Sequence, residues 1–311
     1  MKKKKHQTSL IFAFAALLFS VTPSAKTAAQ TPGAVKVKAI SLGLVSQINQ
    51  KEIEEHFRDF VRYVARRLAS THDIEGRVVL APTALQLAKL LEEKKVDFYM
   101  ESPYPTYLIN KQGAAVLLLR RWKGGMAEYR SIIITKRDSG ITRLEDLRGK
   151  IIAFEDPGSS SGHFLPKVFL LRKGFKLTEK SSLQATVSPR EVGYIFAHRD
   201  GNVVNPVLSR QVAAGAISND DYDALDEIRK ADIRILAETE TLPRHLLSIR
   251  KDLALPLVNR LKEILLSMHE DDEGRTILRR IDNTTKFDLL PGGMEAVRRK
   301  FIEVFNPRQI K

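Results

Sequence analysis

Residues 39–101 read AISLGLVSQINQKEIEEHFRDFVRYVARRLASTHDIEGRVVLAPTALQLAKLLEEKKVDFYME, and their hydrophobic pattern predicts a β-α-β-α-β unit. The predicted strands are the apolar runs at 42–45, 78–81 and 96–100, and the predicted helices have apolar faces within 53–68 and 87–91. Strands that alternate with helices in this way favour a mainly parallel sheet with helices packed on it.

Four polar or aromatic residues come directly after predicted strands. Ser46 follows the first strand, and Glu101, Ser102 and Tyr104 follow the third. Ligands of open parallel sheets bind outside the carboxyl ends of the strands. We therefore expect these side chains at the ligand-binding edge of the sheet.

The rest of the chain predicts a second α/β lobe that is inserted into the first. Further strands are predicted at 115–119, 131–135, 151–154, 213–217 and 233–237, and a helical tail from Leu253 onward. The expected lobe one is 30–135 plus 240–311, and the expected lobe two is 136–239. The chain then crosses between the lobes twice, near Thr135 and near Glu238, which predicts a hinge that bends without letting the lobes separate.

A short helix is predicted after the strand at 131–135. Thr142 is followed three residues later by Glu145, which fits a capping box. Gly149 suits the position just after the last helical turn.

The first 29 residues have the three parts of a secretory signal. Lys2–Lys5 form a positive segment, Leu10–Phe19 an apolar run, and small residues such as Ala25 and Ala29 supply cleavage positions. The apolar run is shorter than the roughly 20 residues that span a bilayer. We expect residues 1–29 to be a signal peptide and the mature chain to be a soluble periplasmic protein; an uncleaved anchor is the alternative.

Composition excludes several classes of protein. The 311 residues are 43% hydrophobic and 28% charged, as in globular proteins rather than disordered or multispanning ones. The net charge is +14, and five of the positive charges lie in the first 29 residues, so the remainder carries +9 and favours anionic partners weakly. Basic residues are spread over helices, which argues against a nucleic-acid partner. Without cysteine, disulfides and thiolate chemistry are excluded.

The loop Asp156–Gly162, DPGSSSG, is the strongest candidate for a binding site. It precedes a predicted helix, whose first turn offers unpaired N–H groups and a partial positive charge. Ser159, Ser160 and Ser161 add hydroxyl donors, which together suit a tetrahedral oxyanion. A capped helix start in a Gly/Ser loop is the other interpretation.

The same residues also match G-x-S-x-G, the pattern of a hydrolase nucleophile elbow. Ser160 would then be the nucleophile, with His245 or His269 as base. Because Glu155, Asp156 and Pro157 separate the loop from its strand, the tight strand-to-helix turn of an elbow is not expected, and a hydrolase is the weakest alternative.

Other motifs are absent or weak. The seven histidines, among them His163 and His198, have no metal-ligand spacing, and neither a phosphate loop nor a Rossmann glycine triplet occurs. Tyr104, Tyr107 and Tyr129 are candidates for the wall of a pocket. We expect no metal and no cofactor.

The sequence resembles the periplasmic phosphate/phosphite/phosphonate-binding proteins of ABC importers, the PhnD-type solute receptors. The likeness covers almost the entire mature chain and is carried by the following segments: EYRS at 128–131, DSGI at 138–141, LEDLRGK at 144–150, AFEDPGSSSG at 153–162 and VAAGAI at 212–217. The resemblance implies a type II periplasmic-binding-protein-like fold, in which two α/β lobes joined by a two-crossing hinge close on a ligand.

By matching positions, the resemblance implies that Ser159, Ser160 and Ser161, with Gly162, bind a phosphorus oxyanion. It brings Tyr129 to the ligand from the hinge, and Tyr104 and Ser46 from the opposite lobe. The family often has a Ser-His pair before the next helix, but here the region reads FAHRDGN (196–202), with His198 at a shifted spacing. Ala213 stands where the family often has an acid, which disfavours an aminoalkyl phosphonate.

The expected function is therefore a non-enzymatic, monomeric receptor. It would bind phosphate, phosphite or a phosphonate between its lobes and deliver it to an ABC permease in the inner membrane. The alternative is a periplasmic sensor or adaptor for a membrane signalling partner.

Overall fold

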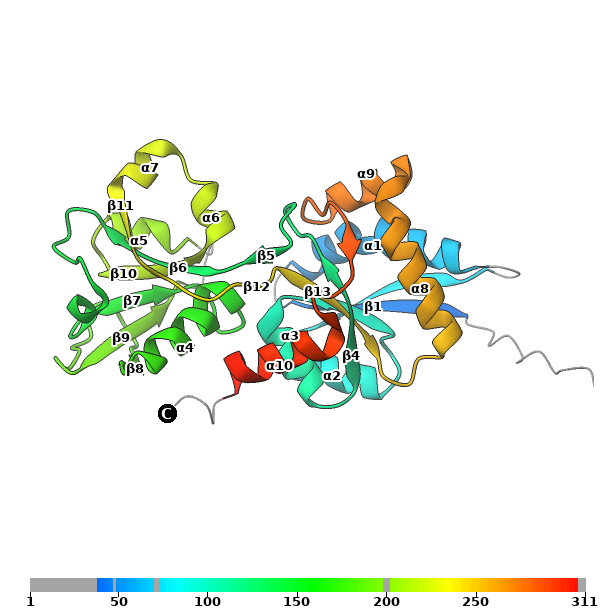
Figure 1. Ribbon diagram of the computed structural model, residues 1–311, viewed down its shortest axis with the longest axis horizontal. Helices are drawn as coiled ribbons and strands as arrows, with labels where there is room; N and C mark the ends of the chain where they lie inside the picture. Colours follow the sequence, from blue (N-terminus) through cyan, green and yellow to red (C-terminus); the bar gives the residue numbers. More distant parts are fainter. Residues whose placement is uncertain (1–37, 47–48, 70–72, 198–201, 307–311) are drawn as a thin grey trace, which may run out of the picture. The chain divides into compact units, whose positions relative to one another are not determined.

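The computed structural model describes residues 38–46, 49–69, 73–197 and 202–306. Figure 1 shows the order of its helices and strands along the chain. The predicted signal peptide and His198 lie outside these residues.

The first lobe is built on a mixed six-stranded sheet. In spatial order its strands are β14 (Phe287–Asp288), β4 (Ala115–Arg121), β13 (His245–Arg250), β3 (Phe98–Glu101), β1 (Ala39–Val45) and β2 (Glu75–Ala81). β1 pairs in parallel with β2 and with β3, which confirms the parallel unit predicted from residues 39–101. β13 is antiparallel to both its neighbours and was not predicted.

Helices cover both faces of this sheet. They are α1 (Gln50–Leu68), α2 (Ala84–Glu92), α3 (Pro103–Lys111), α8 (Leu255–Ser267), α9 (Asp272–Arg280) and α10 (Gly293–Phe305), with the short 3-10 helix η3 (Met268–Glu270). Phe60 and Val64 of α1 pack with Leu261 of α8 on one face, and Leu87 of α2 packs with Tyr99 on the other. The apolar face predicted for residues 53–68 is therefore the buried face of α1.

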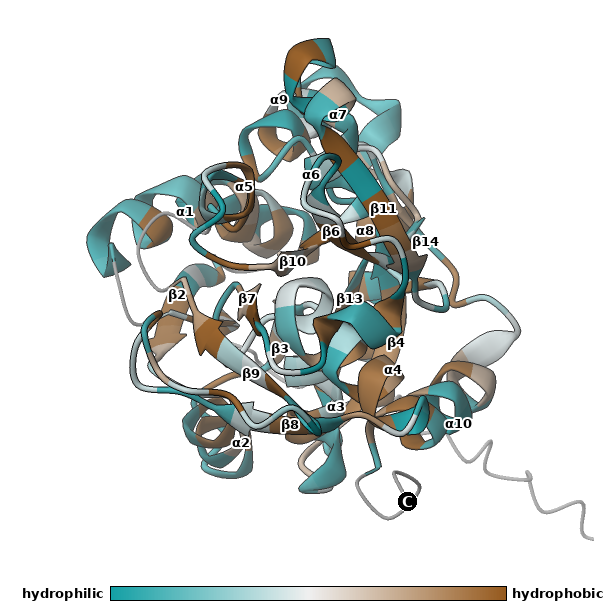
Figure 2. Ribbon diagram, turned by 90° about the vertical axis from the view of Figure 1, so that its left-hand side faces the viewer, coloured by the Kyte–Doolittle hydropathy of each residue, from teal (hydrophilic) through white to brown (hydrophobic). Residues whose placement is uncertain are grey.

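The second lobe is built on another six-stranded sheet. In spatial order its strands are β11 (Ile233–Glu238), β6 (Ser131–Lys136), β10 (Ala214–Ser218), β7 (Ile151–Phe154), β9 (Glu191–Phe196) and β8 (Lys176–Glu179). Its helical segments are η1 (Leu144–Leu147), η2 (Ser160–Phe164), α4 (Leu165–Arg172), α5 (Val204–Leu208), α6 (Asn219–Asp223) and α7 (Glu227–Asp232). The strands carry most of the hydrophobic residues in Figure 2, and the helix surfaces carry most of the hydrophilic ones.

The hinge contains a two-stranded antiparallel sheet of β5 (Glu128–Tyr129) and β12 (Leu242–Pro243). β6 follows β5 directly and pairs with β10 and β11 of the second sheet. The first crossing thus falls near Arg130, not near Thr135 as expected, because Ser131–Lys136 is a central strand of the second sheet. At the second crossing, β11 ends at Glu238 and β12 of the hinge sheet begins at Leu242.

The predicted helix after Thr142 is a 3-10 turn, η1, that starts one residue later. Asp146, not Glu145, supplies the capping carboxylate, since its Oδ2 accepts the N–H groups of Thr142 at 2.9 Å and Arg143 at 3.1 Å. The spacing from cap to acid is still three residues, and both positions move by one because the helix starts at Leu144.

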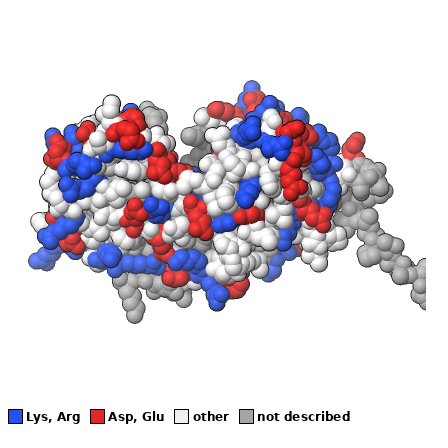
Figure 3. Space-filling view, turned by 45° about the horizontal axis from the view of Figure 1, so that its top comes forward, with Lys and Arg blue, Asp and Glu red and all other residues white. Residues whose placement is uncertain are grey.

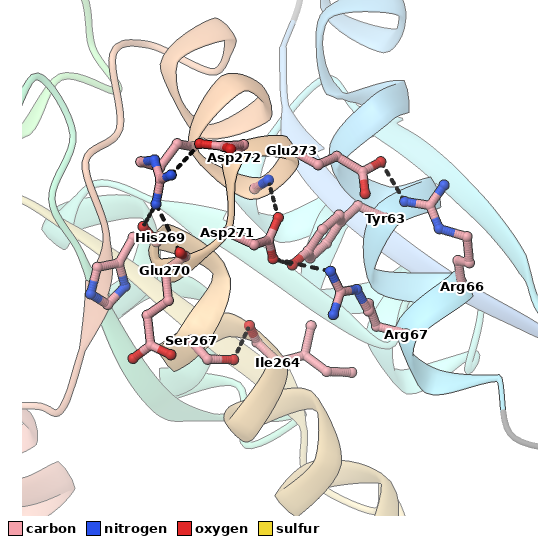
Figure 4. Close-up of polar contacts among 12 residues, drawn as sticks. Tyr63, Arg66, Arg67, Ile264, Ser267, His269, Glu270, Asp271, Asp272 and Glu273 are labelled. Carbon is pink, nitrogen blue, oxygen red and sulfur yellow. Dashed lines mark hydrogen bonds and ion pairs between the residues drawn. The ribbon is translucent and has the colours of Figure 1, made fainter.

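A polar network holds α9 on α1 (Figure 4). Asp271 is the N-cap of α9, where its Oδ1 accepts the N–H of Gly274 at 2.7 Å, and its Oδ2 accepts from Tyr63 at 2.5 Å and Arg67 at 3.1 Å. Burial raises the pKa of Tyr63 to about 12, and the hydrogen bond to Asp271 adds to this shift.

We expect Asp271→Ala to lower the free energy of unfolding by about 1–2 kcal/mol, the usual effect of losing an N-cap. The pKa of Tyr63 should also fall toward its ordinary value, which an ultraviolet pH titration can follow. Asp272→Ala is the matched control, because Asp272 is a neighbouring carboxylate with a 98% exposed side chain. Equal losses for both variants would contradict the capping role.

Candidate binding site at the serine triplet

The serine triplet begins η2, the segment that follows β7 and continues into α4. Ser159 is the N-cap: its Oγ accepts the N–H of Gly162 at 2.9 Å and donates to Glu155 Oε2 at 2.7 Å. A Cβ on Gly162 would lie 2.4 Å from that same Oε2, so glycine allows the turn to close against Glu155. The Ser159 hydroxyl is therefore engaged in shaping the turn.

Ser160 connects the two lobes directly. Its side chain is buried, and its Oγ accepts the N–H of Tyr104 at 2.8 Å and donates to Ser102 Oγ at 3.0 Å. Ser102 and Tyr104 follow β3 at the carboxyl edge of the first sheet, where the sequence placed them. The triplet thus lies at the junction of the lobes and does not face bulk water.

Ser161 and Tyr129 are buried at the same junction. Among the described residues, the Tyr129 Oη lacks a hydrogen-bond partner of good geometry. Burial raises the pKa of Tyr129 to about 12, and the nearby hydroxyls of Ser160 and Ser161 moderate the shift. The Tyr129 hydroxyl is therefore available as a donor.

An aromatic cluster joins the lobes beside the triplet. The rings of Tyr104, on α3, and Phe164, at the end of η2, are stacked with centroids 3.7 Å apart and planes at 18°. Phe305 of α10 packs against both rings, at 5.6 Å and 5.5 Å. The Tyr104 ring is thereby used in packing between the lobes, while its backbone N–H donates to Ser160.

One cation, Arg244, lies against Tyr129, and two more, Lys123 and Arg121, lie together at Asp282. The Arg244 guanidinium lies 4.5 Å from the centre of the Tyr129 ring and donates to Asp220 Oδ2 at 2.8 Å. Lys123 and Arg121 both approach Asp282, at 3.4 Å and 2.9 Å. Burial lowers the pKa of Lys123, and the repulsion from Arg121 and Arg244 adds to that effect while Asp282 opposes it.

Two carboxyl groups flank the triplet, one from each lobe. Glu101 ends β3 next to Ser102, and its Oε1 accepts the N–H of Val45 at 2.8 Å. Burial raises the pKa of Glu101 to about 7, although Val45, Lys123 and Arg121 oppose the shift. Burial also raises the pKa of Glu155, which belongs to the second lobe.

The remaining predicted residues lie as follows. Ser46 is half-buried at the end of β1, where its N–H donates to Ala81 O at 2.9 Å. His163 is buried within η2, and burial lowers its pKa to about 4, so it is neutral at pH 7. Ala213 is half-buried just before β10 and offers no carboxylate to the site.

The arrangement lacks the contact that a serine hydrolase requires. A nucleophilic hydroxyl must lie within hydrogen-bonding distance of its base, but the hydrogen bonds of Ser160 Oγ to Ser102 and Tyr104 include no histidine among the described residues. His245 is buried with Nδ1 unpartnered in the described part of the chain, and burial with the cations nearby holds its pKa well below the usual range.

Three cavities of about 660, 410 and 570 Å³ occur elsewhere in the fold, and none of them is lined by the serine triplet. The cavity of about 660 Å³ lies between α3, β4 and α10. Within the described ranges, no group of three or more His, Asp or Glu side chains is suited to a metal ion, and no helix is both long and apolar enough to span a membrane.

Over residues 42–290 the chain matches the family described as "ABC transporter, phosphonate, periplasmic substrate-binding protein". The chain belongs to this family. The resemblance inferred from DPGSSSG and its flanking segments is thereby confirmed, and the match supports a solute-binding receptor rather than a signalling adaptor.

Two curated relatives are similar to the chain. It is 24% identical over 224 residues to the "Phosphate-import protein PhnD" of Mycolicibacterium smegmatis, which covers 70% of this chain and 64% of that protein. It is 20% identical over 252 residues to the "Phosphonates-binding periplasmic protein" of Escherichia coli, which covers 78% of this chain and 70% of that one. The chain thus spans slightly less than two thirds of the length of the first relative.

Solved structures agree with the two-lobed fold. XAC2383 from Xanthomonas citri, in a structure bound to ATP, has a TM-score of 0.77 and 28% identity, covering 88% of this chain and 97% of that one. PhnD1 from Prochlorococcus marinus, in complex with methylphosphonate, has a TM-score of 0.60 and 15% identity, covering 86% and 99%. The type II periplasmic-binding-protein-like fold is confirmed.

Sequence reasoning missed the cations of the site. Arg244 lies in TLPRH (241–245) and Arg121 and Lys123 lie in RRWK (120–123), neither of which forms a motif with the serine loop. Only the pairing of β13 with β4 brings these segments together, at His245 and Arg121. No local signal in the sequence could have found them.

Proposed function

We propose that the protein is an exported receptor that binds a phosphorus oxyanion between its lobes and delivers it to an ABC permease. Phosphate, phosphite and phosphonates are the candidate ligands. Membership of the phosphonate-binding family supports this proposal. The observation that carries it is the direct contact of Ser160 with Ser102 and the Tyr104 N–H, since it puts donors from both lobes in one place.

The proposed donors come from three segments of the chain. Ser160 and Ser161 come from the second lobe, Tyr129 from the hinge, and Ser102 with the Tyr104 N–H from the first lobe. Tetrahedral oxyanions are bound well by several donors that converge from different directions. Because these donors meet only when the lobes are together, ligand binding would favour the closed state.

Ser159, Gly162, Ser46 and His198 have less direct roles in this proposal. Ser159 and Gly162 would shape the turn that presents the other two serines. Ser46, which follows β1, and His198, which follows β9, remain predicted contacts of the ligand.

The test is calorimetry on residues 30–311 with phosphate, phosphite and methylphosphonate, and with sodium chloride as the blank. We expect saturable binding of at least one of these anions with a Kd of about 1 µM or below, about −8 kcal/mol. If all three leave both the heat signal and the thermal midpoint unchanged, the proposed receptor function is wrong.

A nucleotide is a second candidate ligand. The structure of XAC2383 is described as bound to ATP, and Arg244, Lys123 and Arg121 supply cations that a polyphosphate would require. ATP and pyrophosphate in the same calorimetry distinguish this candidate. Binding of either one at least tenfold tighter than phosphate would favour it.

Export and the absence of catalysis belong to the same proposal. The positive and apolar segments within residues 1–29 support export through a signal peptide to the periplasm. On the face drawn in Figure 3, Lys and Arg are interspersed with Asp and Glu, so this face does not form the continuous basic stripe that a nucleic acid would favour. The Ser160 hydroxyl would act as a donor and not as a nucleophile, and the receptor would work as a monomer.

A further inference from the structure

His163 is held at both of its ring nitrogens. It is buried within η2 and follows the serine triplet and Gly162 directly. Its Nδ1 lies 3.1 Å from the carbonyl oxygen of Pro157, in the loop before the triplet, and its Nε2 lies 3.5 Å from the Nζ of Lys167, one turn further along, in α4. The ring therefore connects α4 with the start of the serine loop.

Lys167 decides which nitrogen of His163 carries the proton. An ammonium group has only donors, whereas a neutral imidazole has one donor and one acceptor. Because Nε2 faces the ammonium of Lys167, Nε2 must accept, so the proton is on Nδ1 and is donated to Pro157 O. The other tautomer would put Nε2–H against the ammonium and the Nδ1 lone pair against a carbonyl oxygen, and both contacts would be repulsive.

Lys167 is itself fixed by side chains of β8 and β9, which lie beside α4 in the second lobe (Figure 1). Its Nζ donates to Tyr194 Oη at 3.2 Å and lies 4.8 Å from the centre of that ring. The Tyr194 hydroxyl donates in turn to Glu179 Oε2 at 3.2 Å. The charges of Lys167, Asp156 and Glu179 act on His163, but burial keeps the ring neutral at pH 7. Each group in this series thus has one consistent role as donor or acceptor.

The Pro157 carbonyl belongs to a peptide group that is held at both ends. On the other side of the same peptide plane, the Gly158 N–H donates to Asp156 Oδ1 at 2.7 Å. The next N–H, that of Ser159, donates to Asp156 O at 3.1 Å. Because a peptide group is planar, its carbonyl and its N–H turn together. Release of the carbonyl from His163 would let this plane rotate immediately before Ser159, the first residue of the triplet.

The triplet requires such support because its turn is unusually wide. The Phe164 N–H donates to Ser159 O at 3.0 Å, across five residues instead of the four of an α-helix. Turns of this width are rare and occur frequently at functional sites. The positions of the Ser160 and Ser161 hydroxyls therefore depend on contacts from outside the turn, and the hydrogen bond from His163 to the loop is one of them.

We propose that Lys167 is a positioning residue for oxyanion binding: it fixes the tautomer of His163, which holds the Pro157 carbonyl and with it the serine triplet. The inference rests on the proposed function. Neither Lys167 nor His163 has to touch the ligand, since their effect reaches it through the backbone of the serine loop.

The first experiment determines the tautomer of His163 at pH 7 by nuclear magnetic resonance, from the chemical shifts of the ring nitrogens in isotope-labelled protein. We expect the Nδ1–H tautomer in the unchanged protein and a mixture of both tautomers in Lys167→Met, which keeps a long side chain without a donor. Lys167→Arg should restore Nδ1–H, because a guanidinium also has only donors. A predominant Nε2–H tautomer in the unchanged protein overturns the proposal without any variant.

Calorimetry with the anion that the unchanged protein binds best tests the link to the ligand. Lys167→Met and His163→Phe should each weaken binding about five- to tenfold, as for the loss of one hydrogen bond. The double variant should bind no more weakly than His163→Phe alone, because both changes act through the same bond to Pro157. Lys167→Arg should bind as the unchanged protein does. The control is Lys173→Met, at an exposed lysine just after α4.

Additive losses in the double variant overturn the proposal, because Lys167 would then act independently of His163. Unchanged affinity in Lys167→Met overturns it as well. If His163→Phe does not fold, the comparison of Lys167→Met with Lys167→Arg decides, since equal losses in both would contradict a role that depends on a donor. If the unchanged protein binds none of the anions, the proposed function fails and this inference with it, which is a different result from tight binding that Lys167→Met does not weaken.

Discussion

The double variant Ser160→Ala/Ser161→Ala should weaken binding of the preferred oxyanion by about 100-fold or more. A hydrogen bond to a charged group contributes about 1.5–3 kcal/mol, so the loss of two donors corresponds to about 3–6 kcal/mol. Ser160 would also lose its bonds to Ser102 and the Tyr104 N–H, so the ligand would no longer meet the donors of both lobes in one geometry. Calorimetry with the anion that the unchanged protein binds best measures the effect.

The matched control is Ser209→Ala/Ser267→Ala. Both serines are exposed, and their hydroxyls donate to carbonyl groups of their own helical segments, Asn205 O at 2.8 Å and Glu263 O at 3.0 Å. The control should bind as the unchanged protein does. If the triplet variant keeps its affinity while remaining folded, the serines are only a capped helix start and the site must lie elsewhere.

Sequence patterns predicted the features that depend on a single contiguous segment of the chain. The apolar residues of α1 repeat with helical period, so the buried face with Phe60 and Val64 could be predicted. The β-α-β order of residues 39–101 predicts parallel strands, and parallel strands put Ser102 and Tyr104 at a common edge. The serine loop was recognisable because its glycines, serines and following helix are contiguous.

Contacts between distant segments could not be predicted in this way. β13 has no alternating pattern of its own, because it is buried between β3 and β4, and its pairing decides that His245 and Arg244 approach Arg121. The crossing near Arg130 was misplaced since residues 131–135 read as a strand that fits either lobe. The role of Ser159 as a cap depends on Glu155, whose orientation the sequence does not reveal.

The site combines a turn held by hydrogen bonds with a buried hydroxyl group that a ligand could use. Ser159 and Gly162 fix the turn against Glu155, while the described residues leave the buried Tyr129 hydroxyl without a hydrogen bond of good geometry. Unsatisfied buried donors are costly unless a ligand or water completes them. In a receptor, the bound anion would accept the hydrogen bond and so offset that cost. The unpaired hydroxyl is therefore consistent with the proposed function.

Arg121→Ala should lower the free energy of unfolding by about 3–5 kcal/mol, the effect of breaking a buried ion pair from one side. Arg121 is 1% exposed and donates to Asp282 at 2.9 Å, to Thr284 Oγ1 at 2.8 Å and to Ile281 O at 2.8 Å. These bonds hold the segment between α9 and β14 against β4. Removing the guanidinium leaves a cavity and several unpaired acceptors.

Urea unfolding followed by tryptophan fluorescence measures this loss, because Trp122 is the single tryptophan and adjoins Arg121. Arg298→Ala is the control. Arg298 pairs with Glu295 by two hydrogen bonds on the exposed face of α10, where such pairs contribute at most about 1 kcal/mol. Since Arg121 is one of the cations beside the proposed site, its loss should also weaken anion binding. A variant that unfolds at lower urea concentration yet binds the anion as tightly would show that the charge of Arg121 stabilises the fold and does not contribute to binding.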